Sequence, residues 1–397
     1  MERLQPLIAG LVTAVVGFAS SFAVVLAGLR AAGADERQAA SGLMALCVSV
    51  GVVAILLGLW LRMPISIAWS TPGAALLLTT PNTDFAAAVG AFVVCGVLIV
   101  LAGFFPPLGR LIGAIPKPIA SAMLGGVLLK LCLAPVAGLT QAPLLTVPVI
   151  LVWALLYRVA RTLAVPGALV AAIAAIALTT EGLGTLDPWP PVEFTAPVFD
   201  LAAVAGIGVP LFLVTMASQN VPGMAVLSGF GYHPPLRPVL LATGAASVAG
   251  AAFGGHAINL AAITAALAAG PDASPDPGRR WIASVTAGAS MIVLGLLSGL
   301  AAALIVLSPP VLIEAVAGLA LLGAMSNAVL EGFRQAEGRE AAVVTFVVTF
   351  SGLSYLGIGS AFWGLLAGGL MHLLLRPQPA SEPASPRERV TRATESE

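Results

Sequence analysis

Charged residues are scarce in this sequence. Lysine and arginine contribute 18 of the 397 residues and aspartate and glutamate another 18, so only 9% of the chain is charged. Soluble domains carry roughly 25% charged residues. A chain with 59% hydrophobic residues and so little charge is expected to be an all-α integral membrane protein. The formal net charge of +0 also leaves no basic surface that would bind nucleic acid.

Cysteine is rare as well, and the residues that metal or redox chemistry needs are not clustered. Cys47, Cys95 and Cys132 stand alone in apolar runs without the spacing of a metal site. We interpret them as small hydrophobic core residues and expect no metal and no cofactor. Paired carboxylates, a His-Glu motif and a Gly-x-Ser-x-Gly turn are also missing at membrane depth. The sequence therefore argues against a membrane enzyme.

Long apolar runs make up most of the chain. A membrane-spanning helix needs about 20 mostly apolar residues, and the pattern predicts about fourteen such segments. The expected spans are 5–29, 39–61, 65–80, 85–107, 112–133, 144–161, 164–181, 200–219, 237–253, 256–269, 281–306, 310–330, 341–356 and 358–375. The third and the tenth are short. The tail, 377–397, contains prolines and charges of both signs and is expected to be disordered.

The distribution of basic residues between the loops predicts the orientation. Cytoplasmic loops are enriched in lysine and arginine. With a cytoplasmic N-terminus, the basic residues on that side are Arg62, Arg110, Lys117, Arg158, Arg161, Arg237, Arg279, Arg280, Arg334 and Arg339. The opposite face holds only Arg30 and Arg37. Both termini are therefore expected in the cytoplasm, and the scarcity of lysine beside abundant alanine and glycine favours a bacterial inner membrane.

A polar, irregular stretch interrupts the third span. Residues 66–76 read Ser-Ile-Ala-Trp-Ser-Thr-Pro-Gly-Ala-Ala-Leu. Irregular backbone at membrane depth is tolerated only inside protein or beside a cavity, because hydrocarbon offers no water to its N–H and C=O groups. Ser70 or Thr71 followed by Pro72 is a typical helix start. A helix that begins halfway across the membrane presents unpaired N–H groups that attract an anion. The alternative is that Pro72 only kinks a packed helix.

The tenth span contains a second break about 190 residues later. Gly-Gly-His-Ala-Ile-Asn at 254–259 leads into an apolar helix, with Asn259 as the expected cap. Residues 116–129 also align with 309–322 in their proline, alanine, glycine and two leucines. Two halves of seven spans run in opposite directions, so the halves are expected to be inverted repeats whose half-helices meet near the midplane.

The expected division of the chain follows from these repeats. Residues 1–181 form the first repeat, 182–199 a periplasmic linker and 200–376 the second repeat. The candidate substrate-binding residues lie at the two breaks and at the end of the eighth span: Ser66, Trp69, Ser70, Thr71, Gly73, Ser218, Gln219, Asn220, Asn259 and Thr264.

His256 is the only ionisable residue at either break. Histidine titrates in the physiological range, which makes His256 the candidate proton carrier. The alternative is a structural histidine that donates a hydrogen bond to a loop carbonyl.

At these residues the sequence resembles the benzoate/H⁺ symporter family of the BenE type. The third-span segment 66–76, the Ser218-Gln219-Asn220 cluster and residues 256–266 carry the resemblance, which covers nearly the whole chain. The family is related to nucleobase and sulfate/bicarbonate transporters. The resemblance implies seven-plus-seven inverted repeats, with a core domain (the first four helices of each half) moving against a gate domain (the last three). It places the substrate between the broken helices 3 and 10, and it makes a homodimer a candidate assembly.

The function that the resemblance implies is proton-coupled uptake of benzoate or a similar aromatic carboxylate by alternating access. Proton-coupled nucleobase carriers use a glutamate in the eighth helix, where this sequence reads Ala217-Ser218-Gln219. Two proton routes then remain. The proton passes through His256, or the substrate carboxylate itself carries it. The alternative is an anion exchanger or channel-like carrier of another small organic anion on the same scaffold. Helix N-termini recognise a carboxylate without distinguishing benzoate from its hydroxylated relatives.

Overall fold

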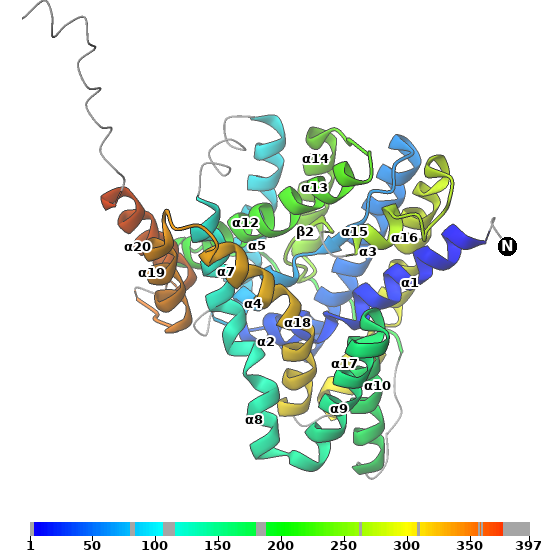
Figure 1. The fold of residues 1–397 in the computed structure, drawn as a ribbon, viewed down its shortest axis with the longest axis horizontal. Coiled ribbons are helices and arrows are strands. Elements are labelled where there is room, and N and C mark those ends of the chain that lie inside the picture. The colour runs from blue at the N-terminus through cyan, green and yellow to red at the C-terminus, as the bar shows by residue number, and fades with distance from the viewer. Residues whose placement is uncertain are drawn as a thin grey trace, which may run out of the picture.

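The computed structural model describes residues 4–79, 84–105, 116–179, 188–261, 264–307, 310–355, 358 and 360–375, and most of them are helical (Figure 1). The helices of the first half are α1 (Gln5–Ala19), α2 (Phe22–Ala31), α3 (Glu36–Leu61), α4 (Thr71–Leu77), α5 (Phe85–Phe104), α7 (Lys117–Cys132), α8 (Ala134–Gln141), α9 (Pro143–Val159), η1 (Arg161–Leu163) and α10 (Ala164–Thr179). Those of the second half are α11 (Leu201–Ala203), η2 (Val204–Gly208), α12 (Val209–Thr215), η3 (Met216–Asn220), α13 (Val221–Gly229), α14 (Leu236–Ala251), α15 (Ala265–Ala269), η4 (Pro277–Arg279), α16 (Trp281–Leu296), α17 (Ser298–Leu307), α18 (Pro310–Phe333), α19 (Arg339–Phe350) and α20 (Ser360–Leu374). Two short strands, β1 (Ile67–Trp69) and β2 (Ile258–Leu260), complete the described part.

Several helices have the length and composition of membrane spans. Six apolar segments of the described chain are long enough to cross a bilayer: Gln5–Ala31, Glu36–Leu61, Phe85–Phe104, Lys117–Gln141, Leu201–Gly229 and Val311–Phe333. Shorter apolar helices include Pro143–Val159, Ala164–Leu178, Leu236–Ala251 and Ser360–Leu374. The chain is therefore a multi-pass membrane protein.

Several of the expected spans differ from the helices observed. The first is divided into α1 and α2, because the hydroxyls of Ser20 and Ser21 both donate to the Gly17 carbonyl, at 3.0 and 3.1 Å, and interrupt the helix there. The fifth continues into α8. The eleventh is divided into α16 and α17, with Leu297 between them.

The eighth span is longer than predicted and runs to Gly229. Two π-helical turns, η2 and η3, widen it, and each lies just before a proline, Pro210 or Pro222. A proline within a helix lacks an N–H group and collides with the carbonyl four residues earlier. The wider turns accommodate both prolines, so the helix passes through the position where the sequence predicted its end.

The inverted repeat is visible in how the helices pack. α3 lies against α16, and α5 lies against α14. In the first pair, a Cβ on Gly51 would lie 2.5 Å from the Gly288 carbonyl oxygen, and one on Gly288 would lie 2.8 Å from that of Gly51. Gly96 and Gly244 make the same reciprocal contact in the second pair. Gly244 follows Gly51, and Gly288 follows Gly96, by about 190 residues. The predicted repeat is thereby confirmed, and glycine allows both pairs of backbones to approach closely.

The remaining helices form a second group. α7 packs against α18 and α19, α9 against α10, and α19 against α20. In Figure 1, α8, α9 and α10 lie with α18 on the lower side of the molecule, away from α5 and α14. Contacts between the two groups include α2 with α18 and α4 with α7. This is the expected division into a core and a gate domain.

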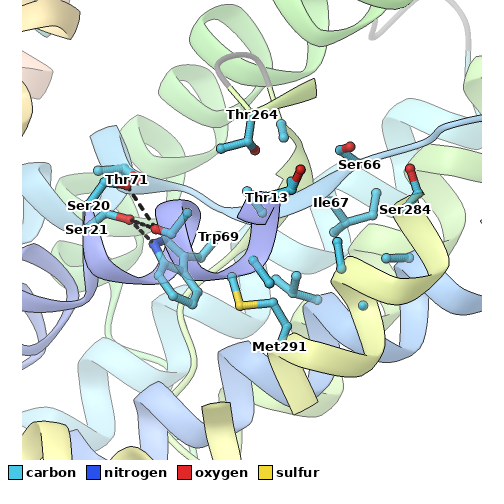
Figure 2. A pocket seen from close by; sticks show the side chains of 18 of the residues that line it. Thr13, Ser20, Ser21, Ser66, Ile67, Trp69, Thr71, Thr264, Ser284 and Met291 are labelled. Atoms are coloured by element: carbon cyan, nitrogen blue, oxygen red, sulfur yellow. Dashed lines mark hydrogen bonds between the residues drawn. The ribbon is translucent and has the colours of Figure 1, made fainter. Parts of the chain in front are cut away.

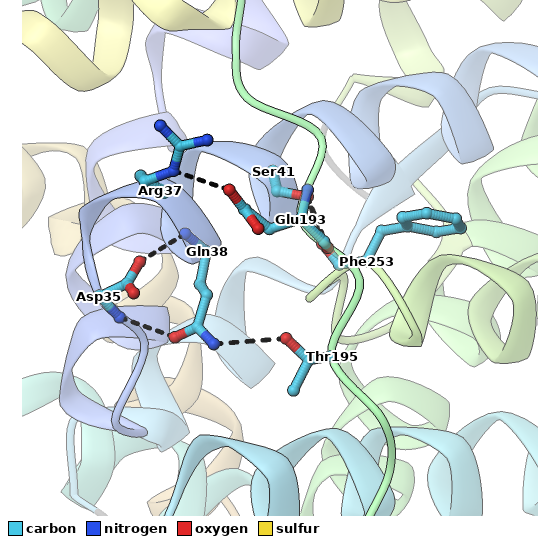
Figure 3. Close-up of polar contacts among 7 residues, drawn as sticks. All are labelled: Asp35, Arg37, Gln38, Ser41, Glu193, Thr195 and Phe253. Atoms are coloured by element: carbon cyan, nitrogen blue, oxygen red, sulfur yellow. Dashed lines mark hydrogen bonds and ion pairs between the residues drawn. The ribbon is translucent and has the colours of Figure 1, made fainter.

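An extended segment joins the two halves and lies along the ends of the core helices (Figure 3). The Ser41 hydroxyl accepts from Glu193 N–H at 3.0 Å and donates to the Phe253 carbonyl at 3.0 Å. Arg37 Nε forms an ion pair with Glu193 Oε1 at 2.7 Å. Thr195 N–H donates to the Ala252 carbonyl at 2.9 Å. The linker therefore ties α3 of the first half to α14 of the second. Residues 182–187 of the predicted linker and the tail, 377–397, lie outside the described residues.

Candidate functional site

The two broken spans meet as a pair of antiparallel strands. β1 pairs with β2 so that Ile67 faces Leu260 and Ala68 faces Asn259. Hydrogen bonds from Ser70 N–H to the Ala257 carbonyl and from Ala261 N–H to the Ser66 carbonyl, both 2.9 Å, extend this ladder at its two ends. Each half-helix follows its strand, and β2 lies near the middle of the molecule in Figure 1. The pairing satisfies the backbone where a bilayer supplies no water.

Side chains from neighbouring helices accept hydrogen bonds from the backbone N–H groups on the outer edge of β2. Asn220 Oδ1 accepts from Leu260 N–H at 3.0 Å, and the Ser247 hydroxyl accepts from Ile258 N–H at 3.0 Å. Asn220 Nδ2 is directed at Met216 Sδ, 3.2 Å away. Asn220 is buried, and its amide oxygen holds the strand while its amide nitrogen contacts its own helical turn.

Ser70 caps α4 as predicted. Its hydroxyl accepts from Gly73 N–H at 3.2 Å and from Thr215 Oγ1, on α12, at 2.9 Å. Pro72 lies in the first turn. A Cβ on Gly73 would lie 2.3 Å from Leu211 Cδ1 and 2.7 Å from Ser70 Oγ, so only glycine fits at this position. The helix start is therefore shaped by α12 and by its own cap.

The predicted capping role of Asn259 is wrong. Asn259 lies in β2, and α15 begins only at Ala265, after Thr264. The amide orientation that satisfies its neighbours has Asn259 Oδ1 accepting from Ser70 N–H at 3.2 Å and Nδ2 donating to the Leu260 carbonyl at 2.8 Å. Pairing with β1 holds the backbone of this segment in an extended conformation, so the helix starts later than its sequence suggests.

A pocket of about 80 Å³ adjoins the paired strands (Figure 2). Its wall comes from α1, α3, the β1 segment, η3, the residues after β2 and α16. The lining residues are Thr13, Ala14, Gly17, Ser20, Ser21, Val50, Ala54, Ser66, Ile67, Ala68, Trp69, Thr71, Gln219, Ala261, Thr264, Ser284, Ala287, Gly288 and Met291. No charged side chain and no histidine is among these described residues. The pocket therefore combines hydroxyls and one carboxamide with an apolar wall.

The structure brings together half of the predicted binding residues. Ser66, Trp69, Thr71, Gln219 and Thr264 line the pocket. The other five are absent from this lining and are Ser70, Gly73, Ser218, Asn220 and Asn259.

Sequence reasoning missed the polar lining from α1, from the junction between α1 and α2 and from α16, above all Thr13, Ser20, Ser21 and Ser284. Serine and threonine often bond to their own helix backbone. Their presence in an apolar run is therefore a weak signal for a site.

Trp69 forms a fixed aromatic wall. Its indole N–H donates to the Ser21 hydroxyl at 2.9 Å, and its ring meets the edge of Phe18 at 6.0 Å between centroids. Phe18 stacks on Phe22 at 5.2 Å. Trp69 is 2% exposed. Its contacts with Ser21 and Phe18 join the first span to the third at the break in each.

His256 is buried outside the pocket lining. Its Nδ1 accepts from Ala257 N–H at 2.7 Å, and its ring lies edge-on to Phe92 at 6.3 Å. A neutral imidazole that accepts at Nδ1 carries its proton on Nε2. That atom has no partner among the described residues. The proton-carrier role stays a prediction.

The chain is similar to known transport proteins over nearly its whole length. A family model described as benzoate membrane transport protein matches residues 2–374. The inner membrane protein YdcO of Escherichia coli (strain K12) is 38% identical over 372 residues, which cover 93% of this chain and 95% of that protein. The benzoate membrane transport protein of Acinetobacter baylyi is 31% identical over 385 residues, with coverage of 95% and 97%.

Solved structures share the fold at low identity. The transmembrane domain of a cyanobacterium bicarbonate transporter, BicA, has a TM-score of 0.60 at 17% identity and covers 92% of this chain and 98% of that one. The structure of SLC26A9 has a TM-score of 0.58 at 14% identity, covering 92% of this chain and 64% of that one. These similarities agree with the inverted-repeat architecture described above.

Proposed function

Because this chain belongs to the benzoate membrane transport family, we propose that it carries benzoate or a similar aromatic carboxylate, together with a proton, across the bacterial inner membrane. The chain is a membrane transporter and not an enzyme. Both termini lie in the cytoplasm in this proposal, as the distribution of arginine between the loops favours.

The observation that carries the proposal is the composition of the pocket. Thr71 and Thr264 stand at the beginnings of α4 and α15, and both line it. Each helix N-terminus carries a partial positive charge that stabilises a nearby anion by about 0.3–2 kcal/mol. Hydroxyls and the Gln219 amide can hydrogen-bond a carboxylate, and Trp69 and Met291 offer the ring an apolar contact surface. An aromatic monoanion therefore suits this pocket without a buried arginine.

The predicted residues outside the lining act in this proposal by holding the helix starts. Ser70, Asn220 and Asn259 satisfy backbone groups of α4, β1 and β2. Ser218 donates to the Val214 carbonyl at 2.5 Å and stabilises the π-helical turn that carries Gln219. The polar contacts to the substrate come from Thr71, Gln219 and Thr264. Trp69 and Met291 supply the apolar contacts.

The transport cycle requires the pocket to open further. Its volume of about 80 Å³ is smaller than the ~150 Å³ cavity that holds benzene in an engineered protein. Nine of the nineteen lining residues belong to the core helices α1, α3 and α16. Movement of the core domain against the gate domain would enlarge the pocket and expose it alternately to the two sides of the membrane.

Proton coupling follows from charge balance in this proposal. One proton and one monoanion move together without net charge, and the proton travels on the carboxylate or through His256. The membrane potential, worth about 2.3 kcal/mol per charge per 100 mV, then contributes nothing. The driving force is the pH gradient alone.

The test is uptake of radiolabelled benzoate into proteoliposomes under one gradient at a time. An inward proton gradient with the potential clamped at zero is expected to drive accumulation. A potential imposed at equal pH on both sides is expected to drive none. Accumulation that follows the potential would contradict electroneutral symport. His256→Ala then distinguishes the two proton routes, because uptake driven by pH survives this change only if the proton travels on the substrate.

One observation favours a second candidate function. Among the described residues, no titratable side chain lines the pocket, as suits an anion exchanger that binds anions only as anions. Exchange predicts benzoate uptake that needs an organic anion on the other side of the membrane and that is unaffected by the pH gradient. Symport predicts accumulation into vesicles that contain no organic anion.

A further inference from the structure

Two buried serine hydroxyls in the pocket wall have no hydrogen-bond partner among the described residues. They belong to Ser66, in the segment just before β1, and to Ser284, in the first turn of α16. Ser66 is 4% exposed and Ser284 is fully buried. Buried polar groups in native proteins are nearly always paired, because a lost hydrogen bond to water is costly. Two unpaired hydroxyls in the wall of one pocket therefore point to a ligand.

The hydroxyls that α1 and the junction between α1 and α2 contribute to this wall are already paired. Thr13 Oγ1 donates to the Ala9 carbonyl at 2.7 Å. Ser20 and Ser21 both donate to the Gly17 carbonyl. The contrast singles out Ser66 and Ser284 as groups whose hydrogen-bonding capacity the protein itself leaves unused.

Both serines are held in place by backbone contacts. The Ser66 carbonyl accepts from Ala261 N–H in the extended strand ladder. Ser284 lies one turn before Gly288, where the backbones of α16 and α3 are in close contact. In Figure 2, Ser66 and Ser284 lie on one side of the view, and Thr71, Ser20 and Ser21 lie on the other. The pocket thus has a second polar end, away from the start of α4.

We propose that Ser66 and Ser284 form a subsite for a ring hydroxyl, so that the protein prefers ring-hydroxylated aromatic carboxylates to benzoate. The inference rests on the proposed function, because it assumes that the carboxylate lies near Thr71 and Thr264. A phenolic hydroxyl both donates and accepts, so it can pair with a serine hydroxyl in either direction. An unsubstituted ring buries both hydroxyls without partners, and sites built to bind a hydroxyl discriminate against ligands that lack it.

The experiment measures binding of benzoate and of 2-, 3- and 4-hydroxybenzoate to the purified full-length protein by isothermal titration calorimetry. The wild type is expected to bind one of the three isomers roughly tenfold more tightly than benzoate, as the gain of hydrogen bonds to buried groups implies. In Ser66→Ala and Ser284→Ala this ratio is expected to fall toward one. Ser298→Ala is the matched control, since the Ser298 hydroxyl is also buried and unpaired among the described residues but lies outside the pocket lining.

The outcomes separate this inference from the proposed function. Wild-type protein that binds benzoate at least as tightly as every hydroxylated isomer overturns the subsite, and this comparison needs no variant. A preference that remains equal in both serine variants and in the control overturns it as well. Failure of all four acids to bind the wild type contradicts the aromatic-carboxylate function together with the subsite.

Discussion

At the scale of single residues, the Ser70 hydroxyl connects two parts of the site. It caps α4 by accepting a hydrogen bond from Gly73 N–H, and it accepts a second one from the Thr215 hydroxyl of α12. The sequence predicted the cap, because serine followed by Pro72 is a local signal. The contact with Thr215 was beyond prediction, since it joins residues far apart in the chain.

Replacing Ser70 by alanine is expected to destabilise the protein by about 1–2 kcal/mol, since it removes a helix cap and the partner of a buried hydroxyl. The thermal unfolding midpoint in detergent checks this, together with the affinity for benzoate. Thr140→Ala is the control, because among the described residues the Thr140 hydroxyl bonds only to its own helix, at the Ala137 carbonyl. Equal midpoints for the two variants would contradict the connecting role of Ser70.

Gly73 offers a second prediction at this scale. Gly73→Ala would place a methyl group against Leu211 and the cap, and overpacking of this kind costs about 1–3 kcal/mol. A lower unfolding midpoint is expected. In a Leu211→Ala background, which removes the contacted group, the Gly73→Ala change is expected to lower the midpoint by less than it does in the wild type. Gly369→Ala on α20 serves as the reference, because no atom of the described residues lies within 4 Å of its added Cβ. The steric argument is wrong if Gly73→Ala unfolds at the reference temperature.

At the scale of elements, the two broken spans show what sequence patterns can and cannot predict. The break in the third span was predictable, because Ser-Thr-Pro-Gly has few other uses in hydrocarbon. The strand at Ile258–Leu260 was not, because its conformation comes from pairing with a segment about 190 residues away. The π-helical turns of the eighth span were also missed, since proline signals an interruption without indicating whether a helix ends or widens.

The linker between the halves allows a prediction that separates two kinds of contact. The Arg37–Glu193 ion pair is exposed, and such pairs contribute about 0–1 kcal/mol. The Ser41 hydroxyl is buried between the linker and α14, and its loss leaves Glu193 N–H unpaired. Ser41→Ala is therefore expected to reduce the free energy of unfolding by about 1–2 kcal/mol more than Glu193→Gln does. The unfolding midpoint of Ser41→Ala should accordingly be the lower of the two. The opposite order would show that the ion pair holds the linker.

At the scale of the whole molecule, the repeat followed from the sequence pattern, and the division into two groups of helices was implied by the family resemblance. Hydropathy and the aligned residues 116–129 and 309–322 indicated two halves of opposite direction. The reciprocal glycine contacts of α3 with α16 and of α5 with α14 show how the halves interlock. Those contacts could not be predicted, because glycine is common in this chain and its partners become known only from the fold.

The central claim is that the pocket beside the paired strands binds an aromatic carboxylate through the starts of the two half-helices. Benzoate binding to the purified protein tests it most directly, with calorimetry on the wild type, Thr71→Val, Thr264→Val and the control Thr140→Val. Thr140 is an exposed residue of α8, and within the described part of the chain its hydroxyl bonds only to the Ala137 carbonyl. We predict saturable binding that weakens about tenfold or more in the first two variants, as loss of a hydrogen bond to a charged group implies, and that is unchanged in the third. Equal affinity in all four proteins would contradict the placement of the site, and absence of binding would contradict the claim itself.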